Sequence, residues 1–198
     1  MKGNKFLSII SVLSLIFILI GTTFSFFSVV NGSTDGAVTS KSATVGVNVT
    51  VSLLYEGRSL IPMNDEDIWK AYENECVDNA DYGACKAYTI DIENIGDEFD
   101  YQGTVKFDIG KISNLNYIVL DENDQEYARG MKIESGQDLS LGDPFTLAQN
   151  DTRQFKLIIW LSNYDRNQNE EDAGGTYNAL ISFESVSGYK ITGSISGS

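Results

Sequence analysis

The sequence predicts an all-β protein: an antiparallel β-sandwich of jelly-roll-like type with one short helical insertion, preceded by an N-terminal hydrophobic export helix. Three observations favour this class. Apolar and polar residues alternate in a series of segments, turn sequences rich in Gly, Asn and Asp separate these segments, and only one stretch of the mature chain has helical character. About eight short strands separated in this way are typical of a sandwich or jelly roll.

The clearest strand covers residues 43–55. Its polar or small positions include Thr44, Asn48 and Ser52, so we expect one face of the strand to lie toward solvent. The other face is apolar at every odd position: Ala43, Val45, Val47, Val49, Val51, Leu53 and Tyr55.

Later segments repeat the period of two. They are residues 88–92, 101–109, 155–161, 177–183 and 189–195. Shorter apolar stretches are further strand candidates, at residues 117–120, 131–133 and 145–147. Turn sequences separate the segments, at residues 94–96, 121–124, 135–136, 142–144, 174–175 and 187–188.

One helix is predicted between the first two strands. Asn64 can cap it, and the acidic residues 65–67 suit its positive N-terminal end. Ile68 and Tyr72 then fall on one face. Trp69 and Tyr72 are available to a ligand or packed on the sandwich, and packing is the usual position of such an aromatic pair.

The N-terminal segment is an export or anchoring sequence. Residues 6–30 carry no charge and follow Lys2 and Lys5. As a signal peptide, residues 1–27 contain small side chains after the apolar region, Thr23 and Ser25, that suit signal peptidase, and the mature chain begins between residues 23 and 31. As a retained anchor, the uncharged run spans roughly 37 Å of helix, enough to cross a bilayer. Either reading predicts a secreted or cell-surface protein.

A small, Gly/Ser-rich stretch at residues 28–42 leads to the sandwich domain, residues 43–198. One interpretation is a flexible spacer. The other is an extension that pairs with the sheet edge of another subunit. The donor-strand candidates for that pairing are apolar and costly to leave in water: Phe26, Phe27, Val29 and Val30.

The charge of the chain limits its partners. The formal net charge of −14 becomes −16 when Lys2 and Lys5 leave with the leader, since 12 basic residues then face 28 acidic ones. This balance argues against nucleic acid and against anionic membrane surfaces. It also suits an acidic shell that keeps a secreted protein soluble. Any membrane contact is therefore expected only through the N-terminal segment.

Cys76 and Cys85 are the only cysteines. In an oxidising compartment we expect them to form a disulfide that pins the helical insertion. A redox or metal pair is the alternative, but it needs closer spacing or two further ligands.

The chain contains no histidine, which excludes Ser-His-Asp and Cys-His nucleophile systems and His-based zinc sites. A Walker A loop is missing, and Ile195 stands where a nucleophile elbow needs serine. A glycosidase with two carboxylates is the only common mechanism left. We therefore expect no enzymatic activity and no cofactor other than calcium.

Three acidic loops are calcium candidates, at residues 97–100, 121–124 and 165–172. The third begins like an EF-hand loop, with oxygen ligands at alternate positions. It departs from that pattern at Glu170, where the loop needs Gly, and at Thr176, where it needs Glu. A solvated acidic loop is the alternative. The candidate ligands are Asp165, Asn167 and Asn169 in this loop and Asp121 and Asp124 in the second.

The end of the leader resembles that of a known family. Residues 21–28, Gly-Thr-Thr-Phe-Ser-Phe-Phe-Ser, are similar to the Gly-Thr-x-Ala-Tyr-Phe-Ser/Thr signature cut by SipW-type signal peptidases in the TasA/camelysin group of surface and biofilm-matrix proteins. Ser25 and Phe26 stand where the pattern has Ala and Tyr, ahead of Phe27. Residues 155–161 and 177–195 are similar to late strands of that family's sandwich. The resemblance implies a secreted domain that polymerises into fibres.

Two functions are therefore in competition. The first is a structural subunit of extracellular matrix fibres, assembled by strand exchange. The second is a monomeric adhesive module that binds a glycan or other surface polymer and is stabilised by calcium.

Overall fold

The computed structural model describes residues 38–42, 46–55, 59–78, 82–97, 99–110, 112, 114–163, 175–185 and 188–197. The chain separates into two compact units, Met1–Gly32 and Ser33–Ser198, and every described residue belongs to the second. The predicted export helix therefore lies outside the described residues. None of the described helices is long and apolar enough to cross a membrane.

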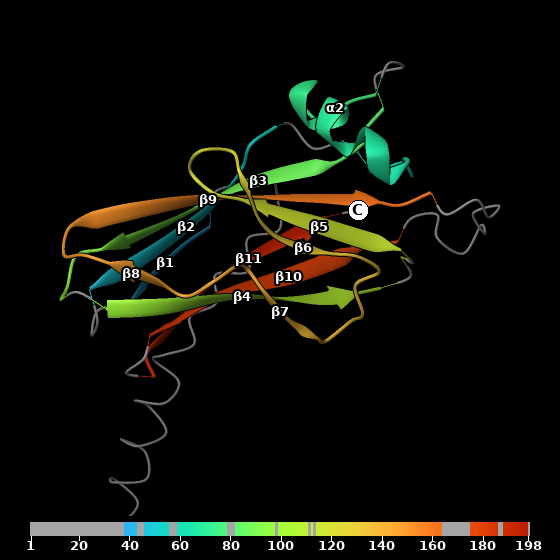
Figure 1. The fold of residues 1–198 in the computed structure, drawn as a ribbon. Helices are drawn as coiled ribbons and strands as arrows, with labels where there is room; N and C mark the ends of the chain where they lie inside the picture. The colour runs from blue at the N-terminus through green and yellow to red at the C-terminus, as the bar shows by residue number, and fades with distance from the viewer. Residues whose placement is uncertain are drawn as a thin grey trace, which may run out of the picture. The chain divides into compact units, whose positions relative to one another are not determined.

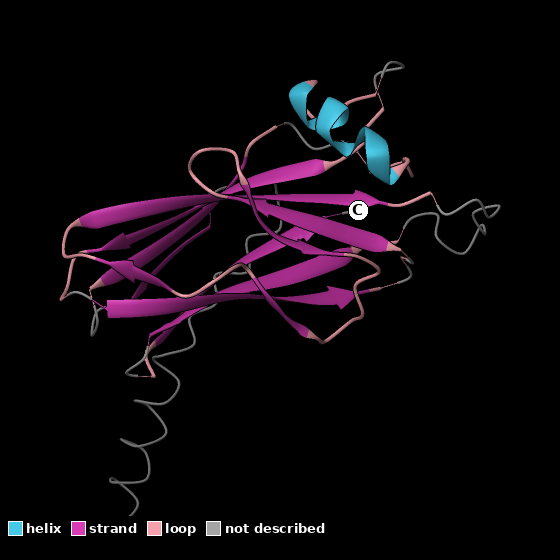
Figure 2. Cartoon of the chain, in the orientation of Figure 1, coloured by secondary structure: helices cyan, strands magenta, loops and turns pink. Residues whose placement is uncertain are grey.

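Two antiparallel sheets lie face to face as the two layers of Figure 1, and strands make up most of the described unit (Figure 2). The six-stranded sheet has the order β1 (Val38–Ser42), β2 (Val47–Leu53), β3 (Lys86–Asn94), β9 (Asp151–Leu161), β5 (Leu115–Leu120) and β6 (Glu126–Gly130). The five-stranded sheet has the order β11 (Lys190–Gly197), β10 (Tyr177–Ser185), β4 (Phe99–Ile109) and β7 (Asp138–Ser140), with β8 (Phe145–Leu147) also paired to β4. The predicted antiparallel β-sandwich is confirmed.

The main core lies between the two sheets and is built by the predicted alternation. Val47, Val49 and Val51 of β2 point inward, while the residues between them are half-buried. On the opposite sheet Phe107 of β4 and Phe183 of β10 are fully buried. Each such side chain contributes about 1.5–3 kcal/mol when it leaves water, so the inward rows account for most of the fold's stability.

The N-terminal boundary of the sandwich was predicted wrongly. Residues 38–42, assigned to the flexible extension 28–42, form β1 and pair with β2 from Val38 opposite Val51 to Ser42 opposite Val47. The predicted strand 43–55 is correspondingly shorter, because β2 begins only at Val47. Gly46 adopts φ +68° just before it, and a Cβ there would lie 2.7 Å from the backbone nitrogen of Gly96. Alternation alone cannot locate a turn inside an alternating segment.

The predicted strand at residues 131–133 was also wrong. Lys132 has φ +53°, which ends the ladder after β6. The backbone N–H groups of this stretch bond to the first two residues of β5 instead. Lys132 donates to Asn116 Oδ1 (2.7 Å), and Ile133 donates to the Leu115 carbonyl (2.9 Å). Two short strands, β6 and β7, lie on either side of this stretch instead.

Candidate functional site

The insertion between β2 and β3 holds the one helical segment that the structure describes. A 3₁₀ turn, Asp65–Asp67, leads directly into α2, Ile68–Glu73. Ile68 and Ala71 are buried, and Tyr72 packs beside them, so the predicted apolar face is confirmed. Asn64 does not cap the helix through its side chain. Its Nδ2 instead donates to Asp67 Oδ2 (3.3 Å).

The insertion covers an apolar patch on the outer face of the six-stranded sheet. Ile118 of β5 and Ile158 and Trp160 of β9 point outward and are fully buried beneath it. Figures 1 and 2 show α2 on this outer side, away from the second sheet. β5 and β9 are thus apolar on both faces, which explains why residues 117–120 and 157–161 are continuously apolar in the sequence.

The predicted disulfide is confirmed. Cys76 and Cys85 are bonded, with Cα atoms 4.7 Å apart, and both are buried. The backbone around the bond is also paired, since the Cys76 N–H donates to the Ala71 carbonyl (2.8 Å) and the Cys76 carbonyl accepts from Ala84 (2.9 Å). The loop is therefore tied to the end of α2 by both covalent and hydrogen bonds.

Asp65 holds the insertion to the sheet through partly buried polar contacts. Its Oδ1 accepts hydrogen bonds from Trp160 Nε1 (2.8 Å) and Asn116 Nδ2 (3.0 Å). Asn116 has no exposed surface, and its Oδ1 accepts from the Lys132 N–H. From the sequence, Asp65 is expected only as an acidic residue at the helix N-terminus. No local pattern could have revealed these partners, because they lie 51 and 95 positions away along the chain.

Lys156 adds a second contact between sheet and insertion. Its Nζ donates to Asp124 Oδ1 and also hydrogen-bonds the Tyr72 hydroxyl. The bond to Asp124 raises the pKa of Lys156 above its usual value, partly opposed by burial. The pKa of Tyr72 is also raised, and here burial is the cause, because it disfavours the charged phenolate. The ring of Tyr72 lies 6.1 Å from that of Tyr55.

The structure places two of the calcium candidates in a turn. Asp121 Oδ1 accepts from the backbone N–H groups of Gln125 (2.8 Å) and Asn123 (2.9 Å), and these bonds, the one from Gln125 foremost, lower the pKa of its carboxyl group. Asp124 pairs with Lys156. Within the described residues no group of three His, Cys, Asp or Glu side chains could hold a metal ion. Asp165, Asn167 and Asn169 lie outside them, so calcium binding there stays a prediction.

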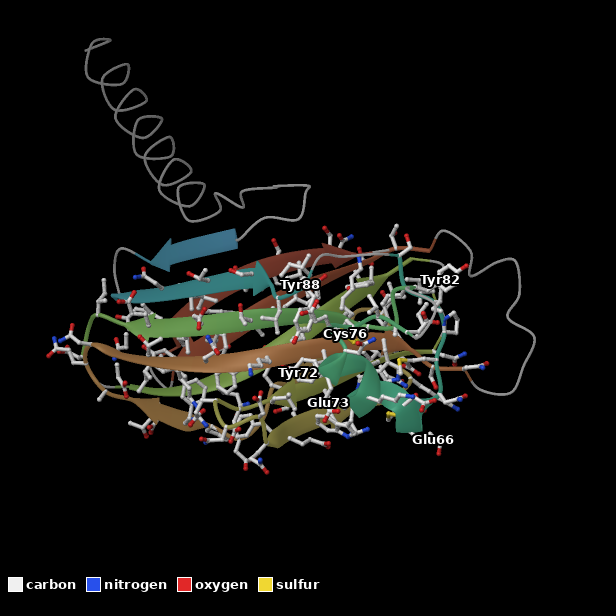
Figure 3. The ribbon with its side chains drawn as sticks, turned by 90° about the horizontal axis from the view of Figure 1, so that it is seen from above. Glu66, Tyr72, Glu73, Cys76, Tyr82 and Tyr88 are labelled. Carbon is white, nitrogen blue, oxygen red and sulfur yellow. A yellow bond between two sulfur atoms is a disulfide. The ribbon has the colours of Figure 1, made fainter. Side chains whose placement is uncertain are left out.

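A groove of about 540 Å³ opens along the insertion. Its wall on one side is the helical segment, with Asp67 at the end of the 3₁₀ turn, Lys70 and Glu73 in α2, and Asn74 directly after α2. The groove extends to Asn163 beyond β9. The apolar part of its lining comes mainly from the chain before and after the helix: Ile61, Pro62, Met63, Val77 and Ala84. Figure 3 shows this side of the molecule, with Glu66 and Glu73 on the helical segment and Tyr82 in the loop beyond it.

The two aromatic residues of the predicted helix have different environments. Tyr72 packs against the outer apolar cluster, as expected. Trp69 points to solvent and is 38% exposed. Tyr82, which the sequence analysis did not single out, is 58% exposed, although its backbone N–H is held by Asp78 Oδ1 (2.8 Å).

The N-terminal edge of the six-stranded sheet is the second candidate region. Among the described strands β1 forms a ladder with β2 alone, so its other side is an open edge. β1 also lies beside β11 of the opposite sheet. The predicted processing residues Thr23 and Ser25 and the donor-strand candidates Phe26, Phe27, Val29 and Val30 precede it and lie outside the described residues.

Comparison with known proteins identifies only remote structural similarity. No known family matches the chain, and no curated protein does. Spo0M, a sporulation control protein from Bacillus subtilis, is 10% identical with a TM-score of 0.41, over 77% of this chain and 48% of that one. The chain thus spans about half the length of Spo0M. A PA14 sugar-binding domain from an RTX adhesin is 12% identical with a TM-score of 0.35, over 75% and 76% of the two chains. Similarity at this level does not bear on function.

Proposed function

We propose that the mature chain is a secreted or cell-surface structural protein that assembles into extracellular fibres by exchange of its N-terminal strand. The observation that carries this proposal is the position of β1. It is an edge strand and the first strand of the described domain. Within the described residues its one hydrogen-bonded partner strand is β2, through a five-residue ladder, and it also lies beside β11 of the opposite sheet.

Exchange of β1 needs no new type of contact. The hydrogen bonds that pair Ser40 with Val49 in one molecule form equally well when β1 comes from the next molecule. A subunit that gives its β1 to one neighbour and receives β1 from another makes a head-to-tail contact. Such a contact does not close on itself, and its repetition produces a filament.

Three further features support an extracellular structural role. The buried Cys76–Cys85 bond suits an oxidising compartment. The acidic composition, with 28 acidic and 14 basic residues, suits a protein that must stay soluble until it assembles. The leader resembles that of the TasA/camelysin group, whose members form fibres. We also propose that the role is not enzymatic, because the chain has no histidine and the usual nucleophile motifs are missing from its sequence.

A cross-linking experiment tests the exchange directly. Thr39 and Thr50 face each other in the β1–β2 ladder. Mature protein carrying Thr39→Cys is mixed with mature protein carrying Thr50→Cys, assembled, and oxidised. If β1 has moved between subunits, the two chains become joined by a disulfide between different molecules. The matched control replaces Thr50→Cys with Thr104→Cys on β4 of the other sheet, and we expect no cross-link there.

Electron microscopy and light scattering of two lengths of the chain complete the test. Mature protein should form thin fibres, and protein that begins at residue 43 should remain a folded monomer. Fibres that form without the cross-link, or that form without β1, would exclude strand exchange. Mature protein that stays monomeric at high concentration would instead favour the adhesive binding module.

A further inference from the structure

The groove along the insertion takes no part in the proposed assembly. The described residues that line it come from neither β1 nor β2. It is built from α2, the segment before it, the turn that follows, and Asn163 after β9. The disulfide and the Asp65 contacts hold these pieces in place, so the groove is a preformed feature of the domain.

The lining combines an apolar surface with short polar side chains. Ile61, Pro62 and Val77 offer carbon atoms, and the Asn163 amide offers both donors and an acceptor. One N–H of the Asn74 amide donates to the Val77 carbonyl (3.1 Å), which leaves its other N–H and its oxygen for a ligand. Glu73 adds a carboxylate that forms no hydrogen bond or ion pair within the described part of the chain. Sugars present these complementary features together, because their C–H faces are apolar and their hydroxyl groups pair with carboxylates and amides.

The backbone of the groove does not suit an added peptide strand. The N–H groups of Ile61 and Met63 already donate to the carbonyls of Gly83 (2.8 Å) and Leu161 (3.0 Å). The Met63 carbonyl accepts from the Asn163 N–H (2.7 Å). Binding by β-strand addition needs unpaired backbone groups, and these three groups of the segment are already hydrogen-bonded. The polar groups left for a ligand are therefore side chains, which favours hydroxyl recognition.

The charge of the lining further restricts the class of ligand that the groove can bind. Among the described residues of the lining, three acids, Asp67, Glu73 and Asp78, outnumber one cation, Lys70. An acidic sugar would meet carboxylates of the same charge, in a chain that is acidic overall.

We propose that this groove binds a saccharide chain that has free hydroxyl groups and no acid groups. A volume of about 540 Å³ lies within the range of ordinary small-ligand sites and accommodates a short stretch of such a chain. In a fibre, every subunit would then hold polysaccharide at a place separate from the subunit contact.

Calorimetric titration of the full mature protein tests the proposal. The probes are purified neutral tetrasaccharides of glucose, galactose, mannose and N-acetylglucosamine, with tetragalacturonate and tetralysine as charged probes. We expect at least one neutral probe to bind and neither charged probe to do so. Glu73→Ala and Asn163→Ala should each weaken that binding by about tenfold, the effect of one lost hydrogen bond to a charged or amide group.

The matched control is Glu66→Ala. Glu66 is an exposed acid on the same helical segment and does not line the groove, so its loss should leave the affinity unchanged. Circular dichroism verifies that each variant is folded, and the two groove variants report independently if one of them is not. Fibre formation by Glu73→Ala should equal that of the parent, which separates this proposal from strand exchange.

Several results would overturn the proposal. Failure of every neutral probe to bind would do so, as would a preference for tetragalacturonate. Binding of tetralysine in place of sugars would assign the groove to a basic peptide. An equal loss of affinity in Glu66→Ala and Glu73→Ala would place the sugar elsewhere.

Discussion

The two sheets differ in their outer faces, both in the residues that these faces carry and in whether another part of the chain packs over them. On the first, Ile158 and Trp160 are fully buried beneath the insertion. On the second, exposed polar residues face one another across the strands, as with Asn178 between Asp108 and Ser196, and no described helix covers them. The difference shows how a single domain can keep one outer face apolar, because the insertion shields it, while the other outer face remains polar.

The same difference is visible in the strand sequences. β10 alternates between buried and exposed residues except at Ser182, because its inner face lies in the core while Asn178 and Leu180 point outward to solvent. β5 is buried at all six positions. A continuous apolar strand in an antiparallel sandwich therefore indicates that a further part of the chain lies on its outer side.

The comparison predicts the largest effect at Ile158. Ile158→Ala should lower the free energy of unfolding by about 2–5 kcal/mol, since it leaves a cavity between sheet and insertion. Leu180→Ala on the other outer face should lower it by less than about 1 kcal/mol, because Leu180 is 39% exposed. Urea denaturation of the two variants measures both values. Equal losses of unfolding free energy would mean that burial of Ile158 beneath the insertion does not stabilise the protein.

The second prediction concerns the polar contact beneath the insertion. Asp65→Ala leaves Trp160 Nε1 and Asn116 Nδ2 without their acceptor, so we expect a loss of about 3 kcal/mol. Asp67→Ala, two residues along the same turn, removes only one long bond from Asn64 and should cost under about 0.5 kcal/mol. Thermal denaturation followed by tryptophan fluorescence compares them. A similar cost for both substitutions would mean that Asp65 contributes only as a charge at the helix N-terminus and not through its hydrogen bonds to the sheet.

The third prediction separates the insertion from the sandwich. Replacing Cys76 and Cys85 together by alanine should destabilise the protein by about 2.5 kcal/mol, the chain-entropy value for a loop of this length. Hydrogen exchange should increase in α2 and the outer side of β9 but not in β10 and β11. Faster exchange throughout both sheets would show that the disulfide supports the whole fold.

The smallest expected effect is at two ion pairs. Lys156→Met, beneath the insertion, should cost about 1 kcal/mol, whereas Lys106→Met, which breaks the exposed 3.3 Å pair with Asp138, should cost a few tenths. The folded-state pKa of Lys156 is raised, so its contribution is complete below the unfolded value of about 10.4 and is lost as pH rises through the folded value. Stability measured from pH 7 to 11 should therefore show the Lys156→Met difference shrinking only at the alkaline end. A difference that persists unchanged there would point to packing and not to charge.

Asn94 illustrates how far a local signal reaches. With Gly96 it predicted a turn, and the turn is present, since Asn94 Oδ1 accepts from the Gly96 N–H (3.1 Å). The same side chain is fully buried and donates to the Leu147 carbonyl (3.0 Å), which joins the turn to the end of β8. The first contact follows from spacing in the sequence. The second does not, because it depends on which strand packs alongside.

The fold class, most inward-facing strand positions, the helical insertion and the Cys76–Cys85 pairing could all be predicted from the order of the residues. These follow from short-range physics: the two-residue period of a strand, the preference of Gly and Asn for turns, and the presence of only two thiols. Three features became visible only in the folded chain: residues 38–42 join the sheet, Asp65 accepts a hydrogen bond from Trp160, and α2 and Asn163 line one groove. Each of these depends on residues far apart in the chain, and periodicity carries no information about which distant elements come to lie side by side.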